Sequence, residues 1–336
     1  MNKKIFITGV AGLLGSHVAD RMIELGYEVI GVDNLIGGFV ENINPKVKFY
    51  KEDCINYEKI KEIMKGCDIV FHAACIAPDG FSLFSPHYIT QNTFGITTSV
   101  LSAAAENKVK KFIYCSSMAR YGTQPKIPYT EDMECFPTTP YGVAKLASEQ
   151  VISQICTLNN INYTILVPHN IIGPRQNYID PYRNVASIMI NRMLQNKQPI
   201  IYGDGEQKRC FSFIQDCVYC IEKAIIQDNL NGEIINIGPD EEFVTINHLA
   251  EEIAKNLEFE LKPIYTKERP NEVKAAVCSS DKARKLIGYK TKISFEDGIK
   301  EMIADIKERK PKKFKYTHPL EINNEKTPET WRKQMM

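Results

Sequence analysis

The chain has 336 residues, of which 43% are hydrophobic, so it has room for one large α/β domain or two smaller ones with an ordinary core. Its 42 Lys and Arg residues balance 41 Asp and Glu residues, which excludes a global field for nucleic acid or an anionic membrane, so any anionic ligand must be held by local arginines. No apolar run reaches the ~18 residues typical of a membrane span, and a strand-like segment opens the chain without a signal peptide, so we expect a cytoplasmic protein without nucleic-acid or membrane partners.

The ten cysteines do not read as a disulfide framework. Most of them lie in or beside apolar runs, which is typical of reduced, buried thiols. Cys217 and Cys220 form a Cys-x-x-Cys pair, but they lie on a helical pattern and no second pair follows. The spacing therefore predicts no metal site.

The first thirty residues predict a strand, a glycine-rich turn, a helix and a second strand. A β-rich run over residues 3–8 breaks at Gly9, and apolar residues then recur at helical spacing until Gly26. Gly9 permits a tight turn, Gly12 lets a phosphate approach the backbone, and Gly15 lets the helix pack closely on the strand. Because backbone N–H groups at the start of such a helix bind pyrophosphate, the turn predicts a dinucleotide site.

An acidic residue ends the second strand of this unit. Asp33 lies 18 residues beyond Gly15, where its carboxylate can accept a hydrogen bond from a ribose 2′-hydroxyl and repel a 2′-phosphate. The glycine spacing, Gly-x-x-Gly-x-x-Gly, is weak evidence alone and also occurs in generic βα turns. The two strands, the helix and the acid together favour a dinucleotide site, and the acid favours NAD over NADP.

Strand-like runs and helical patterns alternate through the rest of the first half. The runs are nearly continuously apolar, which suits a parallel sheet covered on both faces. Further strands are expected at residues 47–50, 68–74, 111–115 and 163–167, and helices at residues 57–65, 86–106 and 141–158. This alternation predicts an α/β fold with a Rossmann-like, doubly wound parallel sheet.

After about residue 170 the pattern loosens into loops and shorter elements. Residues 211–220 and 234–237 read as segments that return to the sheet, and helices are expected at residues 246–257, 280–286 and 295–309. We therefore predict a NAD-binding domain at residues 1–170, a smaller interleaved C-terminal α/β substrate domain at residues 171–310 and a surface tail at residues 311–336. Trp331, the only tryptophan, is expected to anchor the tail.

A tyrosine and a lysine stand one helical turn apart in the expected helix at residues 141–158. Tyr141 and Lys145 are i and i+4, so both side chains face one way. A lysine ammonium and the positive nicotinamide favour the phenolate and would lower the tyrosine pKa from about 10. Ser117 follows a neighbouring strand and can bond the same substrate hydroxyl. An incidental pair on an amphipathic helix is the alternative, but the three residues with the glycine turn predict catalysis.

The chain resembles the extended short-chain dehydrogenase/reductases that modify nucleotide sugars, over roughly residues 3–300. The resemblance rests on the glycine turn and on motifs spread along the chain: Asp33, Asp53, His72-Ala73-Ala74, Ser116-Ser117, Tyr121-Gly122, Tyr141 with Lys145, Asn170, Gly173-Pro174-Arg175, Gly203-Asp204-Gly205 with Arg209, and Arg269. Within this family it is most similar to the UDP-glucose 4-epimerases, which residues 121–129 match almost letter for letter.

The resemblance implies which residues hold NAD. Asp53 and Cys54 would hold the adenine, and Ala73, Ala74 and Asn92 would line the pyrophosphate and nicotinamide. The full implied set of cofactor residues is Gly9, Gly12, Leu13, Leu14, Gly15, Asp33, Asn34, Asp53, Cys54, Ala73, Ala74, Asn92, Tyr141 and Lys145.

The resemblance also implies a nucleotide-diphosphate sugar as substrate. Asn170 would donate to the diphosphate, Arg209 and Arg269 would neutralise it with charge-assisted bonds, and Tyr202 would flank the base. Ala276 matches a gatekeeper beside the C2 group of the sugar, where a small residue admits 2-acetamido sugars. The implied substrate-binding residues are Ser117, Asn170, Asn184, Tyr202, Arg209, Arg269 and Ala276.

Four features bear on the subclass or depart from the family pattern. Ser117-Met118-Ala119 stands where dehydratases usually have Thr-Asp-Glu, and neither Met nor Ala can do acid–base work. Arg120 occupies a usually apolar position; we favour a structural pairing with a buried acid such as Glu131 over contact with a charged substrate such as a uronate. His169 is expected near the nicotinamide, where a lone histidine is more often structural than catalytic. Pro78-Asp79-Gly80 interrupts the loop that lines the substrate pocket.

The predicted function is therefore an NAD-dependent nucleotide-sugar epimerase of carbohydrate metabolism. It would invert C4 of a UDP-hexose (UDP-glucose, UDP-galactose or a 2-acetamido analogue) through a 4-keto intermediate, with Ser117, Tyr141 and Lys145 as catalytic residues. A related enzyme (a 4-reductase, dehydrogenase, uronate 4-epimerase, C3/C5 epimerase or dehydratase) is the alternative, and a non-catalytic NAD-binding regulator is a remote one. The helices at residues 86–106 and 141–158 resemble the family's dimer interface, so we expect a homodimer.

Overall fold

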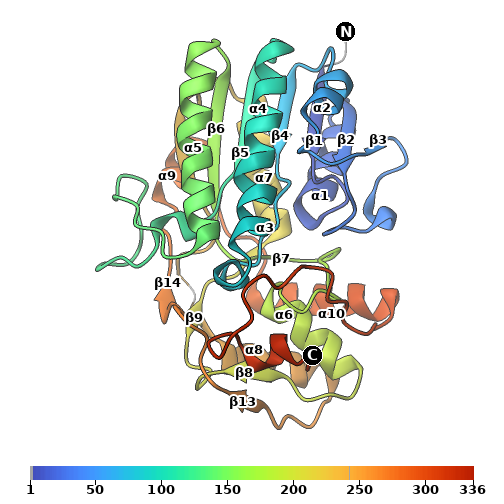
Figure 1. The fold of residues 1–336 in the computed structure, drawn as a ribbon, viewed down its shortest axis with the longest axis vertical. Helices are drawn as coiled ribbons and strands as arrows, with labels where there is room; N and C mark the ends of the chain where they lie inside the picture. Colours follow the sequence, from blue (N-terminus) through green and yellow to red (C-terminus); the bar gives the residue numbers. More distant parts are fainter. Residues whose placement is uncertain (1–2, 242) are drawn as a thin grey trace.

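The structure, a computed structural model, describes residues 3–241 and 243–336, so residues 1–2 of the predicted NAD-binding domain and residue 242 of the predicted substrate domain lie outside it. A parallel sheet of seven strands in the order β11-β6-β5-β4-β1-β2-β3 forms the centre of the larger half (Figure 1). Its strands are β1 (Lys4–Thr8), β2 (Glu28–Asp33), β3 (Lys48–Lys51), β4 (Ile69–His72), β5 (Lys111–Cys115), β6 (Asn162–Pro168) and β11 (Glu233–Ile237).

Helices cover both faces of this sheet, which explains why its strands are apolar throughout. One core cluster joins one face of the sheet to α2, α4 and α5, and a second joins the other face to α1, α7 and α9. The helices are α1 (Leu13–Glu24), α2 (Tyr57–Ile63), α4 (Ile96–Glu106), α5 (Pro140–Leu158), α7 (Ile214–Ile226) and α9 (Asp281–Ile287). This arrangement confirms the Rossmann-like, doubly wound α/β fold.

The chain crosses back into the sheet late in the sequence, as expected for residues 211–220 and 234–237. β11 pairs in parallel with β6, and α7 packs against α1 on the same face of the sheet. Residues contributed by the second half of the chain thus complete the first half's core. The division at residue 170 stays a prediction.

A smaller half lies beyond the carboxyl ends of the strands (Figure 1). Its core joins α6 (Val185–Leu194), α8 (Ile246–Leu257) and α10 (Phe295–Arg309). Short strands pair around it: β8 (Ile200–Tyr202) with β13 (Ile264–Thr266), β9 (Lys208–Arg209) with both β12 (Val244–Thr245) and β14 (Ala275–Ala276), and β7 (Ile171–Ile172) with β10 (Ser212–Phe213). Side-chain caps begin α8 and α10, where Thr245 and Ser294 accept from the N–H three residues on.

One expected helix is broken. Residues 86–106 form α3 (Pro86–Thr90), a π-helical turn η3 (Gln91–Gly95) and α4 rather than one continuous helix. The break lies at Asn92, whose φ of −86° and ψ of 15° are non-helical, and whose side chain bonds the carbonyl of Tyr88 at 2.8 Å. The expectation of a single long helix was therefore wrong. A π-bulge breaks the backbone geometry of a helix but leaves no clear mark in the apolar pattern of the sequence, and such bulges often occur at functional sites.

The tail, residues 311–336, is also more than a surface segment. It returns from α10 along the smaller half, passes α3 and ends in α11 (Glu329–Arg332). Trp331 is an anchor, as expected, with 4% of its surface exposed. The correction is its place: Trp331 and Met336 lie in the wall of the central cleft. The remaining short helices are η1 (Val40–Asn42), η2 (Gly80–Leu83) and η4 (Met118–Tyr121).

Two further findings concern residues 3–241 and 243–336, which include all ten cysteines. None of the cysteines there is joined in a disulfide, and burial raises the pKa of the Cys217 thiol, so this half of the Cys-x-x-Cys pair on α7 is a core residue. No helix in this part of the chain has the length and apolar character needed to cross a membrane.

Candidate active site

A cleft of about 530 Å³ runs between the two halves, at the carboxyl ends of the sheet strands. Parallel sheets gather their ligands at this edge. Every residue that the sequence analysis assigned to cofactor, substrate or catalysis lies in its wall, from Gly9 at one end to Arg269 at the other. The structure therefore brings the whole predicted set into one space, although binding by each residue stays a prediction.

The glycine turn joins β1 to α1 and forms one end of the cleft. Gly9 has a φ of +71°, and a Cβ on Gly15 would lie 2.1 Å from the carbonyl oxygen of Gly9, so neither position tolerates a side chain. α1 begins at Leu13 with no side-chain cap and no acidic residue in its first turn. Its first N–H groups therefore face the cleft as a cradle for an anion, which fits the pyrophosphate of a dinucleotide.

Acidic and amide side chains stand beside the glycine turn. Asp33 accepts hydrogen bonds from the N–H groups of Ala11 at 3.0 Å and Leu35 at 2.7 Å, and burial raises its pKa. Asn34 donates to Asp53 at 2.8 Å. Two backbone bonds fix the Asp33 carboxylate toward the cleft, and a carboxylate has lone pairs left for ribose hydroxyls. This fits NAD as predicted.

The next strand end continues the cofactor side. The hydroxyl of Thr8 accepts from the N–H groups of Ala73 and Ala74 at 3.1 Å each, which holds the turn after β4 against β1. The break at Asn92 lies at the same edge, because its carbonyl accepts from the N–H of Ile76 at 3.2 Å. The irregular helix is thus fastened to the loop that lines the cleft.

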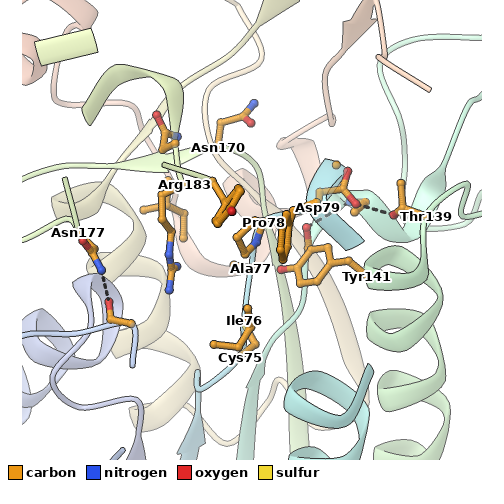
Figure 2. Close-up of a pocket in the computed structure, with 18 of the residues that line it drawn as sticks. Cys75, Ile76, Ala77, Pro78, Asp79, Thr139, Tyr141, Asn170, Asn177 and Arg183 are labelled. Atoms are coloured by element: carbon orange, nitrogen blue, oxygen red, sulfur yellow. Dashed lines mark hydrogen bonds between the residues drawn. The ribbon is translucent and has the colours of Figure 1, made fainter. Parts of the chain in front are cut away.

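Tyr141 and Lys145 lie at the middle of the cleft on the first turns of α5. Thr139 caps this helix by accepting from the N–H of Gly142, and its hydroxyl donates to Asp79 beside Tyr141 (Figure 2). The ammonium of Lys145 donates to the carbonyl of Cys115 at 2.7 Å and lies 5.8 Å from the centre of the Tyr141 ring. The helix spacing therefore places both groups as predicted.

The electrostatics of this pair correct one expectation. Burial raises the pKa of Tyr141 well above 10, and the charge of Lys145 opposes but does not outweigh it. Burial also favours the neutral amine of Lys145, but the thiol and phenol groups around it outweigh burial and raise its pKa. Lys145 does lower the pKa of Tyr141, as predicted. Burial raises that pKa by more, because Tyr141 is only 6% exposed.

Ser117 follows β5 and lines the cleft, while its neighbours serve the fold. The Ser117 hydroxyl accepts from the N–H of Ala119 at 3.2 Å. Arg120 pairs with Glu149 at 2.8 Å, both buried, and Ser116 donates to the same carboxylate. The structural role of Arg120 is confirmed, but its proposed partner was wrong, because Glu131 instead accepts from the backbone of Asn236.

Two arginines form the other end of the cleft. Arg209 on β9 and Arg269 each bond Glu272, at 2.7 Å and 2.6 Å between the closest atoms. The guanidinium of Arg269 also stacks 4.9 Å from the centre of the Tyr202 ring. A diphosphate fits two fixed guanidinium groups at this end, because planar donors with fixed geometry recognise phosphate oxygens.

Three other predicted substrate residues also line the cleft. Asn170 has a φ of +43° and donates to the carbonyl of Cys210 at 3.0 Å. Asn184 caps α6 by accepting from the N–H of Ala186, so part of its hydrogen-bonding capacity is used by the fold. Ala276 on β14 is 6% exposed and lies beside Arg209 in the strand register.

His169 does not share this cleft. It is fully buried, and its Nε2 contacts the carbonyl of Pro239 at 2.7 Å. Burial lowers its pKa, which favours the neutral imidazole. His169 is outside the cleft lining and contacts the residue two positions after β11, which agrees with the structural role expected for it.

Several cleft residues were missed from the sequence. Figure 2 shows Arg183 pointing into the space that Tyr141 faces, and Arg183 also pairs with Asp180 at 3.3 Å. Trp331 and Met336 come from the tail. No local signal marks these residues, because Arg183 reaches the cleft from the segment before α6, and Trp331 and Met336 reach it from the distant tail. Among the described residues, no group of three or more His, Cys, Asp or Glu side chains is arranged to hold a metal ion.

Comparison with known proteins agrees with the geometry. The model of the NAD-dependent epimerase/dehydratase family matches residues 5–238, which span the sheet from β1 to β11. Among curated proteins, the chain is similar to a putative UDP-glucose 4-epimerase of Methanocaldococcus jannaschii, with 35% identity over 304 residues that cover 89% of this chain and 97% of that protein.

Two solved structures are similar along nearly the whole chain. The UDP-glucose 4-epimerase of Thermotoga maritima with UDP-glucose has a TM-score of 0.86 and 31% identity, covering 91% of this chain and 99% of that one. The UDP-glucuronic acid 4-epimerase of Bacillus cereus in complex with UDP-glucuronic acid and NAD has a TM-score of 0.85 and 29% identity, covering 91% and 100%. These two structures hold different UDP-sugars, so similarity alone does not select the substrate.

Proposed function

Because the chain belongs to the NAD-dependent epimerase/dehydratase family, we propose that it inverts the C4 configuration of a UDP-hexose through a 4-keto intermediate. The cleft supports this proposal most directly: Tyr141 and Lys145 line the same space as the glycine turn and as Arg209 and Arg269. A nucleotide sugar held by its diphosphate at the arginines would reach back toward the tyrosine with its sugar ring.

The residues divide the work as follows. When bound at the glycine turn, NAD would supply the hydride acceptor and donor for C4. Tyr141, as phenolate, removes the proton of the C4 hydroxyl, and Lys145 stabilises that phenolate. Ser117 bonds the same hydroxyl and orients it. Arg209 and Arg269 hold the diphosphate while the 4-keto sugar turns its other face to the cofactor, so the binding energy comes from the nucleotide part.

Dehydration is disfavoured because the residues after Ser117 cannot exchange protons. Met118 and Ala119 begin the short helix η4, and neither carries an ionisable group. Elimination of water therefore lacks an acid–base pair at these two positions, where dehydratases of the family usually have one. A reductase or a dehydrogenase would show a net change in NADH, whereas a 4-epimerase shows none.

A uronate 4-epimerase is the nearest alternative, because one similar structure holds UDP-glucuronic acid. The charges near Tyr141 argue for a neutral hexose. Asp79 lines the cleft beside Thr139; burial raises its pKa, and in its ionised form it would repel a uronate carboxylate. Arg183 is the cleft arginine that could pair with a uronate carboxylate. It is instead bound to Asp180, and its guanidinium lies near Gly37.

Ala276 supports acceptance of a 2-acetamido group. Its small side chain lies in the cleft wall beside Arg209, so it would leave space for a substituent at C2 of a sugar whose diphosphate is held by Arg209. We expect UDP-N-acetylglucosamine to turn over as well as UDP-glucose. An Ala276→Tyr variant should keep activity on UDP-glucose and lose it on the 2-acetamido sugar.

A panel of UDP-, GDP-, CDP- and dTDP-sugars, including UDP-glucuronic acid, tests the function, with NMR readout of the C4 configuration and absorbance at 340 nm for NADH. We expect C4 inversion of UDP-glucose and UDP-N-acetylglucosamine without net NADH. Net redox on any of these sugars, or inversion of UDP-glucuronic acid alone, would overturn the proposal.

We also propose a homodimer formed through α4 and α5, which lie side by side on one face of the sheet (Figure 1). Val143 and Leu158 on α5 are 51% and 77% exposed, which is apolar surface that a four-helix interface would bury. Light scattering at micromolar concentration should give twice the chain mass of 38.3 kDa; a monomer would contradict the proposal.

A further inference from the structure

The tail holds together the two sides of the cleft. It follows α10, lies beyond residues 5–238 matched by the family model, and crosses between α3 and α6 in dark red in Figure 1. Its contacts with both halves are specific hydrogen bonds and ion pairs, so it has one defined course.

On the side of the sheet, the tail is bound to η2 and α3. Ser85 donates to the carbonyl of Pro319, and the N–H groups of Glu321 and Ile322 donate to the carbonyl of Phe84 at 3.1 Å and 2.8 Å. The carboxylate of Glu321 accepts from the first N–H groups of α3, at His87 and Tyr88. A carboxylate at a helix N-terminus satisfies donors that the helix leaves open.

On the opposite side, the tail is bound to the smaller half. His318 is buried and contacts Asp180 at 3.0 Å, and Arg192 donates to the carbonyl of Met335 at 3.3 Å. Thr330 shares a hydrogen bond with the hydroxyl of Tyr202. Since the Tyr202 ring carries the guanidinium of Arg269, the tail also supports the arginine end of the cleft.

The apolar end of the tail faces the cleft itself. Trp331 packs edge-on against Phe81, Phe84 and Tyr182, with ring centres 5.7, 6.0 and 5.6 Å away. Its indole and the guanidinium of Arg269 approach Gly80 together, each 4.0 Å from where a Cβ on Gly80 would lie. Trp331 therefore stands beside the arginine end, next to the loop of Pro78 and Asp79 that faces Tyr141.

We propose that the tail is a wall of the substrate pocket and that Trp331 contacts the bound nucleotide sugar where the sugar joins the diphosphate. The inference rests on the proposed function for the identity of the ligand. An indole edge offers an apolar face to a neutral sugar ring, and its removal opens space at the mouth. Trp331 thus determines how tightly, and with what substituents, the sugar is held, while proton transfer stays with Tyr141.

Trp331 is the only tryptophan in the chain, so its fluorescence reports directly on this wall. Titration of the wild-type protein with UDP-glucose, and separately with UDP, should change the tryptophan emission saturably, with a midpoint that follows KM for UDP-glucose. The same concentrations of glucose should leave the emission unchanged. An emission that UDP-glucose and UDP do not affect would overturn the proposal, and this arm needs no variant that folds.

A Trp331→Ala variant should raise KM for UDP-glucose about 10-fold, the loss expected for one aromatic contact, while kcat and bound NAD change little. Its selectivity should also relax, raising kcat/KM for UDP-N-acetylglucosamine relative to UDP-glucose. Trp331→Phe, which keeps an aromatic ring, should restore most of the lost affinity. Lys326→Ala, at an exposed tail position, is the matched control and should behave as wild type.

These outcomes separate the tail from the function. Saturable emission changes with UDP-glucose, but no C4 inversion of any sugar, would leave the wall standing and reject the epimerase. Normal epimerisation, tryptophan emission that does not respond to UDP-glucose, and an unchanged KM in Trp331→Ala would overturn the role of the tail but not the epimerase function. A variant that only lowers the melting temperature, with KM and selectivity unchanged, shows a structural anchor and also overturns the proposal.

Discussion

At the cofactor end of the cleft the lining comes mainly from one sheet, whereas at the substrate end it comes from separate pieces of chain. β1, β2 and β4 are neighbours in the sheet and deliver Gly9, Asp33 and Ala73 to one edge. Arg209, Arg269 and Trp331 come from β9, a loop and the tail. Neighbouring parallel strands fix the positions of the residues at their ends, so the sheet itself positions the cofactor end. The substrate end is positioned by ion pairs and aromatic contacts between separate segments.

This difference indicates which end of the cleft tolerates amino-acid substitutions. A change at the cofactor end strains a turn that admits no Cβ, as at Gly15. A change at the substrate end alters side chains that meet through single contacts, such as Arg269 over Tyr202. Substrate preference can therefore shift while the cofactor site stays the same, which agrees with similar structures that hold different UDP-sugars.

The largest effect is expected between the two ends. Tyr141→Phe removes the proposed base and should lower kcat by at least about 100-fold, while NAD stays bound because the ring still fills its place. Kinetics and the absorbance of released cofactor measure both. Tyr163→Phe, whose hydroxyl contacts Ser153 outside the cleft, is the control. Retained activity in Tyr141→Phe would mean that another group is the base.

Lys145 tests the electrostatics of the same place. Because Tyr141 must lose its proton and burial raises its pKa, activity should rise with pH along an acid limb. Removing the ammonium removes a nearby charge that lowers this pKa, so Lys145→Met should move the limb to higher pH and cost about 10- to 100-fold near neutrality.

Lys145→Arg keeps the positive charge and is the matched comparison for this pH profile. Its limb should stay closer to that of the wild type, since the phenolate still has a cation nearby. An acid limb that does not move in Lys145→Met would show that lysine serves only to hold the carbonyl of Cys115.

The substrate end should respond separately. Arg209→Ala and Arg269→Ala each remove a charge-assisted contact and should raise KM for UDP-glucose about 10- to 100-fold, with bound NAD unchanged. Lys208→Ala, an exposed neighbour of Arg209 on β9, should have no such effect. Loss of NAD in the arginine variants would show that cofactor binding depends on the substrate end of the cleft.

The smallest effect is expected at Asp33. Asp33→Asn should weaken NAD retention about 10-fold, the loss of roughly one hydrogen bond to a charged group, and reduce the preference over NADP, with KM for UDP-glucose unchanged in cofactor-saturated enzyme. Isothermal titration of cofactor-free protein measures this.

The acid response of Asp33 has a defined sign. Its pKa is raised, so the carboxylate is lost at a higher pH than for an ordinary aspartate, and NAD affinity should fall as pH drops through that range. Asp132→Asn, at an exposed position, should leave cofactor binding unchanged, and an equal loss there would point to a general effect of charge.

The fold, and the residues predicted to hold the cofactor, could be read from the amino-acid sequence alone. Alternating apolar strands and helices, the glycine turn, Asp33 and the i, i+4 pair of Tyr141 and Lys145 are local patterns, and local geometry carries them into space. The family could also be recognised from the sequence, since its motifs lie along most of the chain, and the comparisons confirm the family.

Features that depend on contacts between distant segments are visible only in the folded chain. The break at Asn92, the pairing of Arg120 with Glu149 rather than Glu131, and burial outweighing lysine at Tyr141 follow from packing that no local pattern encodes. The tail is the clearest case: its sequence reads as a surface segment, yet contacts with Phe84, Asp180 and Tyr202 draw Trp331 into the cleft wall. Such contacts join residues over a hundred positions apart, and only the folded chain brings them together.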